Sequence, residues 1–174
     1  MAVWYFAYGS NMQSATLRGR RGVDYQHAIP ARVAGWQLVF DKPGLVGFGT
    51  SYANIVPNPN ASVLGVLFAV SDADLEHIDF TEGVLIGNYR RIAVPVTVLP
   101  TLPDPPRTAF TLTSDRRDPT LRPSHRYMAM LIEGAREHGL PEDYIAFLHT
   151  VPAAPEPPEA VEMRALIDDA MRRR

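Results

Sequence analysis

Six short segments rich in β-branched and aromatic residues occupy the first two-thirds of the chain, separated by turn formers. Such segments are typical of β-strands. The first of them stops at Gly9-Ser10-Asn11, which predicts a buried strand that breaks into a tight turn. The core is therefore expected to be built mainly from β-structure. The six expected strands are Val3–Tyr8, Val33–Phe40, Asn54–Val56, Val63–Val70, Tyr89–Val98 and Thr108–Thr113.

Helical patterns occur at two places. A short helix is predicted between Ser71 and Glu82, because Ser71 can cap it and acidic residues fill its first turn. From Ser124 onward, apolar residues recur at helical spacing, and we expect one helix up to Gly139 and another from Pro141. Their apolar faces are expected at Met128, Leu131, Ile132 and Ala135 in the first and at Tyr144, Phe147, Leu148 and Val151 in the second.

The length of 174 residues fits one domain with a sizeable core. We expect this domain to span residues 1–151, with a long surface loop from Leu99 to Pro106. Residues 152–174 then form a Pro-rich spacer and an amphipathic helix that packs on the same domain or on a partner. The apolar face of that helix is expected at Met163, Leu166, Ile167 and Ala170.

Charge and composition exclude several classes of function. The formal net charge of -2 gives no general attraction to phosphate backbones or anionic lipid, so no nucleic-acid partner is expected. The short basic clusters, including Arg18-Gly19-Arg20-Arg21, are interpreted as solvated surface. No segment has the apolar length of a membrane span, and a cytoplasmic protein without membrane partners is expected. The absence of cysteine excludes thiolate nucleophiles and Cys-ligated metal sites.

Familiar catalytic motifs are also missing. The five histidines lie singly, without spacing that would place two of them on one metal ion, so no metal site is predicted. No G-x-S-x-G elbow surrounds Ser10, which is therefore not expected to be a nucleophile. Gly47-Phe48-Gly49 lacks the lysine and third glycine of nucleotide-binding loops and is interpreted as a flexible loop.

Two features remain that suit a concave site: the Gly9-Ser10-Asn11 turn and the Glu82-Gly83 pair. Backbone N–H groups at such a turn can hold a carboxylate or a carbonyl oxygen that gains negative charge. Taken singly, however, the first is better explained as a plain β-turn and the second as a solvated glutamate. Asp79 and Glu76 could form a glycosidase-like carboxylate pair, but their spacing gives no evidence of one.

Taken in order along the chain, these segments resemble the γ-glutamylcyclotransferase family, which is related to AIG2-like proteins. The two most specific segments are Y-F-A-Y-G-S-N at Tyr5–Asn11 and E-G-V-x-x-G-x-Y at Glu82–Tyr89. The other matching segments are Ala53-Asn54-Ile55, Leu64–Phe68, Tyr127 and Gly134–Pro141. The resemblance implies an α/β (α+β) fold, a small mixed β-barrel of about six strands with surrounding helices.

The resemblance further implies a cofactor-independent reaction on a small γ-glutamyl substrate. In that reaction the free α-amine attacks the γ-carbonyl of the same glutamyl group, which expels an amine or amino acid and leaves 5-oxoproline. Glu82 matches the catalytic glutamate of the family, which shuttles the proton between the two nitrogens. Val84 and Leu85 are expected to shield its carboxylate from water.

By the same resemblance, substrate-binding positions fall on one strand, its turn and one later tyrosine. Phe110 stands where the family usually has tyrosine, which leaves one hydroxyl contact in doubt. The expected substrate-binding residues are Tyr5, Phe6, Ala7, Tyr8, Gly9, Ser10, Asn11 and Tyr127.

Three functions stay open at this level. The first is cyclotransfer on γ-glutamyl dipeptides or amides. The second is the same chemistry on a γ-glutamyl amine or on a biosynthetic intermediate that carries a γ-glutamyl cap. The third is a non-catalytic binding or interaction module, which the last helix could serve by docking to a partner. That helix also leaves room for a homodimer.

Overall fold

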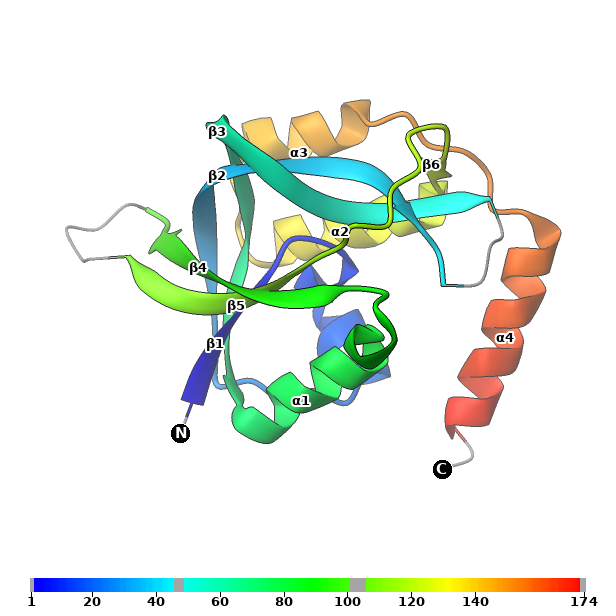
Figure 1. Ribbon diagram of the computed structural model, residues 1–174, viewed down its shortest axis with the longest axis horizontal. Helices are drawn as coiled ribbons and strands as arrows, with labels where there is room; N and C mark the ends of the chain where they lie inside the picture. The colour runs from blue at the N-terminus through cyan, green and yellow to red at the C-terminus, as the bar shows by residue number, and fades with distance from the viewer. Residues whose placement is uncertain (1, 46–48, 101–105, 173–174) are drawn as a thin grey trace.

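The computed structural model describes residues 2–45, 49–100 and 106–172. Within them, six strands form one sheet in the order β1-β5-β4-β2-β3-β6, and β1 also pairs with β3. That extra pairing closes the first five strands into a barrel, with β6 attached outside it (Figure 1). The strands are β1 (Ala2–Ala7), β2 (His27–Pro43), β3 (Thr50–Ser71), β4 (Arg90–Val98), β5 (Arg107–Thr113) and β6 (Arg122–Pro123).

The first strand closes the barrel because it has a partner on each side. β1 runs antiparallel to β3, from the pair Ala2 and Ser71 to the pair Ala7 and Val66. On its other side it runs parallel to β5, with Tyr5 opposite Phe110. Closure leaves these five strands without an open edge. The prediction of a small mixed β-barrel with helices is confirmed.

The separation of Asn54–Val56 from Val63–Val70 is wrong, because both belong to the single long strand β3. The Pro and Asn residues between these two segments, which the sequence predicts as a turn, lie at a bulge of β3. The pairing with β2 jumps from Ala34 opposite Ser62 to Trp36 opposite Pro57, so four residues of β3 face one residue of β2. A bulge tolerates proline, since it requires no ladder hydrogen bond there.

The described residues form four α-helices: α1 (Asp72–Thr81), α2 (His125–Glu137), α3 (Glu142–Thr150) and α4 (Pro158–Arg172). Ser71 Oγ accepts a hydrogen bond from Asp74 N, and Ser124 Oγ accepts one from Tyr127 N, so both predicted caps are confirmed. In Figure 1, α1 lies on one side of the barrel, α2 and α3 on the other, and α4 beside it. None of these helices is both long and apolar enough to cross a membrane.

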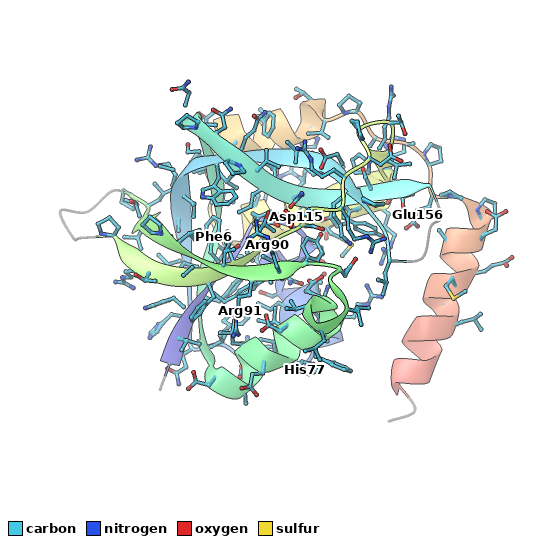
Figure 2. The ribbon with its side chains drawn as sticks, viewed as in Figure 1. Phe6, His77, Arg90, Arg91, Asp115 and Glu156 are labelled. Carbon is cyan, nitrogen blue, oxygen red and sulfur yellow. The ribbon has the colours of Figure 1, made fainter. Side chains whose placement is uncertain are left out.

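The core fills the barrel and the contact with α2. Phe6, labelled in Figure 2, is fully buried, and the predicted face of α2 at Met128, Leu131, Ile132 and Ala135 is buried as well. The predicted face of α3 needs correction, because Phe147 is exposed and Ile145 is buried in its place. In so short a helix the pattern of apolar residues does not determine which of two neighbouring positions faces the core.

The sequence predicts that the last helix is amphipathic, with Met163, Leu166, Ile167 and Ala170 on its apolar face. Leu166 is exposed, whereas the side chains of Ile167 and Ala170 lie outside the described residues. Residues 101–105 of the predicted loop after Leu99 also lie outside the described residues, as do Gly47 and Phe48 of the predicted flexible loop. Backbone hydrogen bonds from His125 N to Ala154 O (2.9 Å) and from Ala154 N to Pro123 O (3.0 Å) attach the Pro-rich spacer to the start of α2.

Gly134 in α2 lets the helix press against the chain that follows β1. A Cβ atom at this position would lie 2.6 Å from Gln13 N and 2.7 Å from Met12 C, both backbone atoms. The substitution Gly134→Ala is therefore expected to lower the free energy of unfolding by about 1–3 kcal/mol, as overpacking does. Denaturant unfolding measures this change, and Gly19→Ala, which meets nothing within 4 Å, is the matched control. A stable Gly134→Ala protein would contradict the close packing.

Candidate active site

One cavity of about 360 Å³ opens between the turn after β1, the end of α1, the β2 and β3 strands and α2. Its wall includes most of the residues that the sequence singled out. Ala160 and Met163 from the first turns of α4 also border it. The predicted site residues that line the cavity are Tyr5, Tyr8, Gly9, Ser10, Asn11, Glu82 and Tyr127.

Glu82 stands at the C-terminal end of α1, where the helix stops. Its backbone N–H still donates to Ile78 O at 2.9 Å, and Gly83 then turns the chain with a φ of 70°. This left-handed conformation suits glycine, which has no Cβ to clash. Asn88 fixes the turn, because its Nδ2 donates to Glu82 O at 2.8 Å and its N–H donates to Gly83 O at 2.9 Å.

The carboxylate of Glu82 is held by two groups inside the cavity. Asn11 Nδ2 donates to Glu82 Oε1 at 2.9 Å, and the same amide donates to the Tyr5 hydroxyl at 2.9 Å. Arg21 Nη2 forms an ion pair with Glu82 Oε1 at 2.7 Å. The side chain of Glu82 is only 16% exposed. These two contacts hold its largely buried carboxylate in one orientation at the cavity wall.

The interpretation of the cluster Arg18-Gly19-Arg20-Arg21 as solvated surface is wrong for Arg21. Its side chain is only 18% exposed and its guanidinium lines the cavity. The π-helical turn Ala15–Arg20 carries the chain from the first strand to this position. No local pattern distinguishes Arg21 from the neighbouring arginines, because its contact with Glu82 joins segments far apart in the sequence.

The turn after β1 is fixed by its own backbone, and two tyrosines near it are held by other parts of the barrel. Met12 N donates to Gly9 O and Gln13 N donates to Ser10 O, which forms the 3-10 turn Ser10–Met12. The Tyr127 hydroxyl accepts a hydrogen bond from Ala53 N at 3.1 Å, and the Tyr8 hydroxyl donates to Leu112 O at 2.6 Å.

Burial is the main cause that raises the pKa of the Tyr5, Tyr8, Tyr89 and Tyr127 phenols above their ordinary value. The negative charge of Glu82 raises each of them further. All four hydroxyls are therefore neutral at physiological pH. The cavity thus offers neutral hydroxyl groups around the well-held carboxylate of Glu82.

The cavity wall also contains a buried lysine that the sequence analysis did not identify. Lys42 is 2% exposed, and its Nζ donates to Asn88 Oδ1 at 2.6 Å. The ammonium lies 4.4 Å from the centre of the Tyr89 ring. Burial and then the Arg116 guanidinium lower the pKa of Lys42 to about 8.

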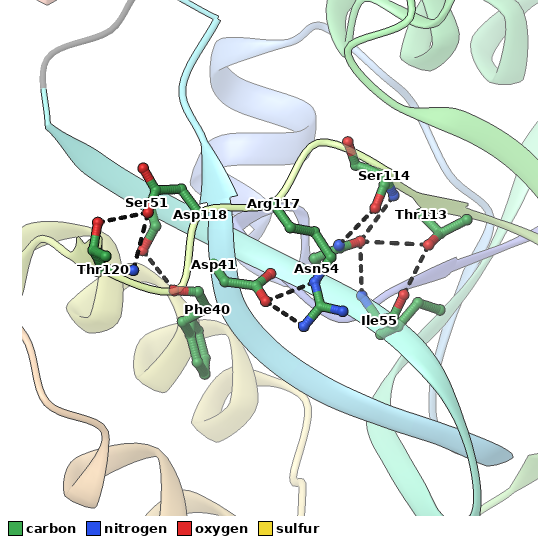
Figure 3. A network of polar contacts seen from close by, with 10 residues as sticks. All are labelled: Phe40, Asp41, Ser51, Asn54, Ile55, Thr113, Ser114, Arg117, Asp118 and Thr120. Atoms are coloured by element: carbon green, nitrogen blue, oxygen red, sulfur yellow. Dashed lines mark hydrogen bonds and ion pairs between the residues drawn. The ribbon is translucent and has the colours of Figure 1, made fainter.

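A second layer of polar contacts lies behind Asn88, and Figure 3 shows the part of it around Asn54, Ser114 and Asp41. Asn54 Nδ2 donates to Ser114 O at 2.8 Å, Ser114 N donates back to Asn54 Oδ1 at 2.9 Å, and Ser114 Oγ donates to Asn88 O at 2.7 Å. Close by, Arg117 pairs with the buried Asp41 on β2. Buried and paired groups of this kind fix the wall of a cavity.

The remaining predicted residues lie elsewhere. Phe6 and Ala7 are buried in the core and do not line the cavity. Leu85 is 84% exposed, so the expectation that it shields Glu82 is wrong, because Gly83 and Gly87 turn that segment outward. The ring of Phe110 lies under the Arg91 guanidinium, 5.0 Å away, and outside the cavity lining.

The structure shows no carboxylate pair at Asp79 and Glu76. Asp79 forms an ion pair with Arg91 at 2.8 Å, whereas Glu76 is exposed, so the two do not face each other across a cavity. In the part of the chain that the structure describes, no three His, Asp or Glu side chains gather closely enough to hold a metal ion.

Comparison with known proteins agrees with the resemblance of the motifs. Residues 62–148 match the AIG2-like family. The γ-glutamyl cyclotransferase aclK of Aspergillus oryzae is 30% identical over 175 residues, which cover 90% of this chain and 63% of that protein. The γ-glutamylcyclotransferase of Homo sapiens is 30% identical over 144 residues, which cover 80% of this chain and 73% of that protein.

Solved structures share the fold as well. A crystal structure of the human uncharacterized protein loc79017 has a TM-score of 0.75 and 25% identity, and the match covers 93% of this chain and 97% of that one. A structure of a γ-glutamyl cyclotransferase has a TM-score of 0.76 and 23% identity over the whole of both chains. The chain therefore belongs to the γ-glutamylcyclotransferase family, with its AIG2-like members.

Proposed function

We propose that the chain is a γ-glutamyl cyclotransferase that releases 5-oxoproline from a γ-glutamyl dipeptide or amide. The observation that carries this proposal is the carboxylate of Glu82, which faces a cavity beside the Gly9–Asn11 turn and is held there by Asn11 and Arg21. The family relatives named γ-glutamylcyclotransferase support the same activity.

The reaction moves two protons from the α-nitrogen, which begins as an ammonium and ends as a lactam N–H, to the departing nitrogen, which leaves as an ammonium. The α-ammonium of the substrate has no lone pair, so Glu82 first removes a proton from it. The freed amine then attacks the γ-carbonyl carbon, which forms the new C–N bond of the ring. As the carbon–nitrogen bond to the leaving group breaks, Glu82 gives the proton it holds to the departing nitrogen. Glu82 then moves the second proton from the ring nitrogen to the released amine, so that the ring ends as a neutral lactam and the amine as an ammonium. Atoms and charge balance without a cofactor.

The turn and the tyrosines have a positioning and electrostatic role in this proposal. The γ-carbonyl oxygen gains negative charge while the ring closes, and donors aimed at it lower the barrier. Neutral hydroxyls such as that of Tyr127 and the N–H groups of the Gly9–Asn11 turn can serve as such donors. Holding the α-amine close to the γ-carbon supplies a further part of the rate enhancement.

A panel of substrates tests the proposal. Purified protein is incubated with γ-glutamyl dipeptides, γ-glutamyl amines and glutamine, and 5-oxoproline is quantified by mass spectrometry. Release from dipeptides supports the proposed function, whereas release from amines alone favours the γ-glutamyl amine alternative. Tight binding of these ligands in calorimetry, without any 5-oxoproline, would instead show a non-catalytic binding module.

A further inference from the structure

The cavity contains a positive charge that the reaction at Glu82 does not use. Lys42 on β2 is 2% exposed, yet it lines the cavity wall. Among the described residues, no carboxylate lies within ion-pair distance of its Nζ, whose one hydrogen-bond acceptor is Asn88 Oδ1 at 2.6 Å. A buried ammonium without a carboxylate partner is costly and rare, so its position points to a role in binding.

The acceptor of Lys42 is shared with a second cation. Arg116 Nη1 also donates to Asn88 Oδ1, at 3.0 Å. Two positive groups thus converge on one neutral oxygen, which cannot neutralise either. The π-faces of Tyr89 and Tyr52, whose ring centres lie 4.4 and 5.9 Å from Lys42 Nζ, compensate only part of this charge. An anion that enters the cavity would meet an ammonium with free hydrogen-bonding capacity.

A γ-glutamyl amino acid has two carboxylates, and their positions relative to Glu82 differ. The α-carboxylate is attached to the same carbon as the α-amine, which must lie against Glu82, next to the Arg21 guanidinium. Asn88 lies between Glu82 and Lys42. Its Nδ2 donates to Glu82 O, and its Oδ1 accepts from Lys42 Nζ. The second carboxylate, on the departing amino acid, is the group that can reach this side.

We propose that Lys42 binds the carboxylate of the leaving amino acid and so selects γ-glutamyl amino acids over γ-glutamyl amines. This inference rests on the proposed cyclotransferase function and names its substrate class. Asn88 orients the ammonium, and the rings of Tyr89 and Tyr52 flank it. No change in bonding is involved, since Lys42 contacts a group that does not react.

A matched substrate pair tests the proposal. γ-Glutamylalanine and γ-glutamylethylamine differ only in the carboxylate on the leaving group. The substitution Lys42→Met keeps the length of the side chain and removes its charge. It is expected to lower kcat/KM for γ-glutamylalanine by about 10- to 100-fold, the range for a lost hydrogen bond to a charged group. The kcat/KM for γ-glutamylethylamine is expected to change little.

The pH dependence gives a second readout. Because the pKa of Lys42 is lowered to about 8, its charge is present below this pH and lost above it. Binding of γ-glutamylalanine should therefore weaken as the pH rises through 8, whereas γ-glutamylethylamine should show no such loss. Lys42→Met should remove the difference. The other groups that face Lys42 are Arg116, Glu82, Tyr52 and Tyr89, and of these Glu82 favours its charged form.

Folding and surface charge are controlled separately. Removal of a buried ammonium is expected not to lower the melting temperature, so Lys42→Met should stay folded. Arg90→Met removes an exposed cation that pairs with Asp115 (Figure 2) and should leave kcat/KM for both substrates unchanged.

Equal losses of kcat/KM on the two substrates in folded Lys42→Met would overturn the inference and leave the proposed function standing. Failure of the unmodified protein to release 5-oxoproline from either would overturn the proposed function, and this inference with it.

Discussion

Replacement of Glu82 by glutamine is expected to lower kcat for 5-oxoproline formation by about 10²- to 10⁴-fold, the contribution of a positioned general acid and base. Glutamine keeps the size of the side chain, and its carbonyl oxygen can still accept the hydrogen bond from Asn11. It cannot remove a proton from the α-ammonium or return one to the leaving nitrogen. The loss should therefore appear mainly in kcat and to a smaller extent in KM.

The control for this substitution lies on the same helix. Glu76 is an exposed glutamate of α1, and Glu76→Gln should leave kcat unchanged. Melting temperatures of both variants show whether each is folded. A folded Glu82→Gln protein with the rate of the unmodified chain would remove Glu82 from the mechanism.

The substitution Asn11→Ala is expected to lower kcat/KM by about 10- to 100-fold, because it removes a hydrogen bond to a charged carboxylate. The Asn11 amide joins the Tyr5 hydroxyl to Glu82 Oε1, at 2.9 Å from each. Without it, Arg21 alone holds the carboxylate, and Glu82 can rotate away from the substrate amine. Steady-state kinetics of 5-oxoproline release measures the loss.

A matched asparagine lies far from the cavity. Asn60 is exposed in the bulge of β3, and Asn60→Ala should leave the kinetics unchanged. If Asn11→Ala raised KM and left kcat intact, Asn11 would contribute to binding the substrate and not to orienting the base. Unchanged kinetics in Asn11→Ala would mean that the Asn11 contact with Glu82 has no role in the reaction.

Local patterns predicted the parts of the fold in which neighbouring residues determine the outcome. The cap at Ser71 and the end of α1 at Glu82 were predicted correctly, since capping and helix stops are short-range effects. The course of β3 through Pro57 was not, because only its pairing with β2 keeps that segment extended. Closure of the barrel also depends on β1, which pairs with residues of β3 that lie 59 to 69 positions away.

The candidate site shows the same division. Glu82 and the Gly9–Asn11 turn were found through an ordered match of motifs, whereas spacing alone left each of them ambiguous. Arg21 and Lys42 were missed because each is one basic residue among many in the sequence. Their significance comes from burial and from partners on distant segments, Glu82 for the first and Asn88 for the second. An isolated lysine on an expected strand gives no signal of this kind.

The most direct test of the central claim is the fate of water oxygen during turnover. The protein is incubated with γ-glutamylalanine in water enriched in ¹⁸O, and the products are identified by mass spectrometry. Attack by the substrate's own amine predicts alanine and 5-oxoproline without ¹⁸O, because no water molecule enters the new bond. Glutamate that contains ¹⁸O would instead show hydrolysis and would contradict Glu82 as a proton shuttle for ring closure.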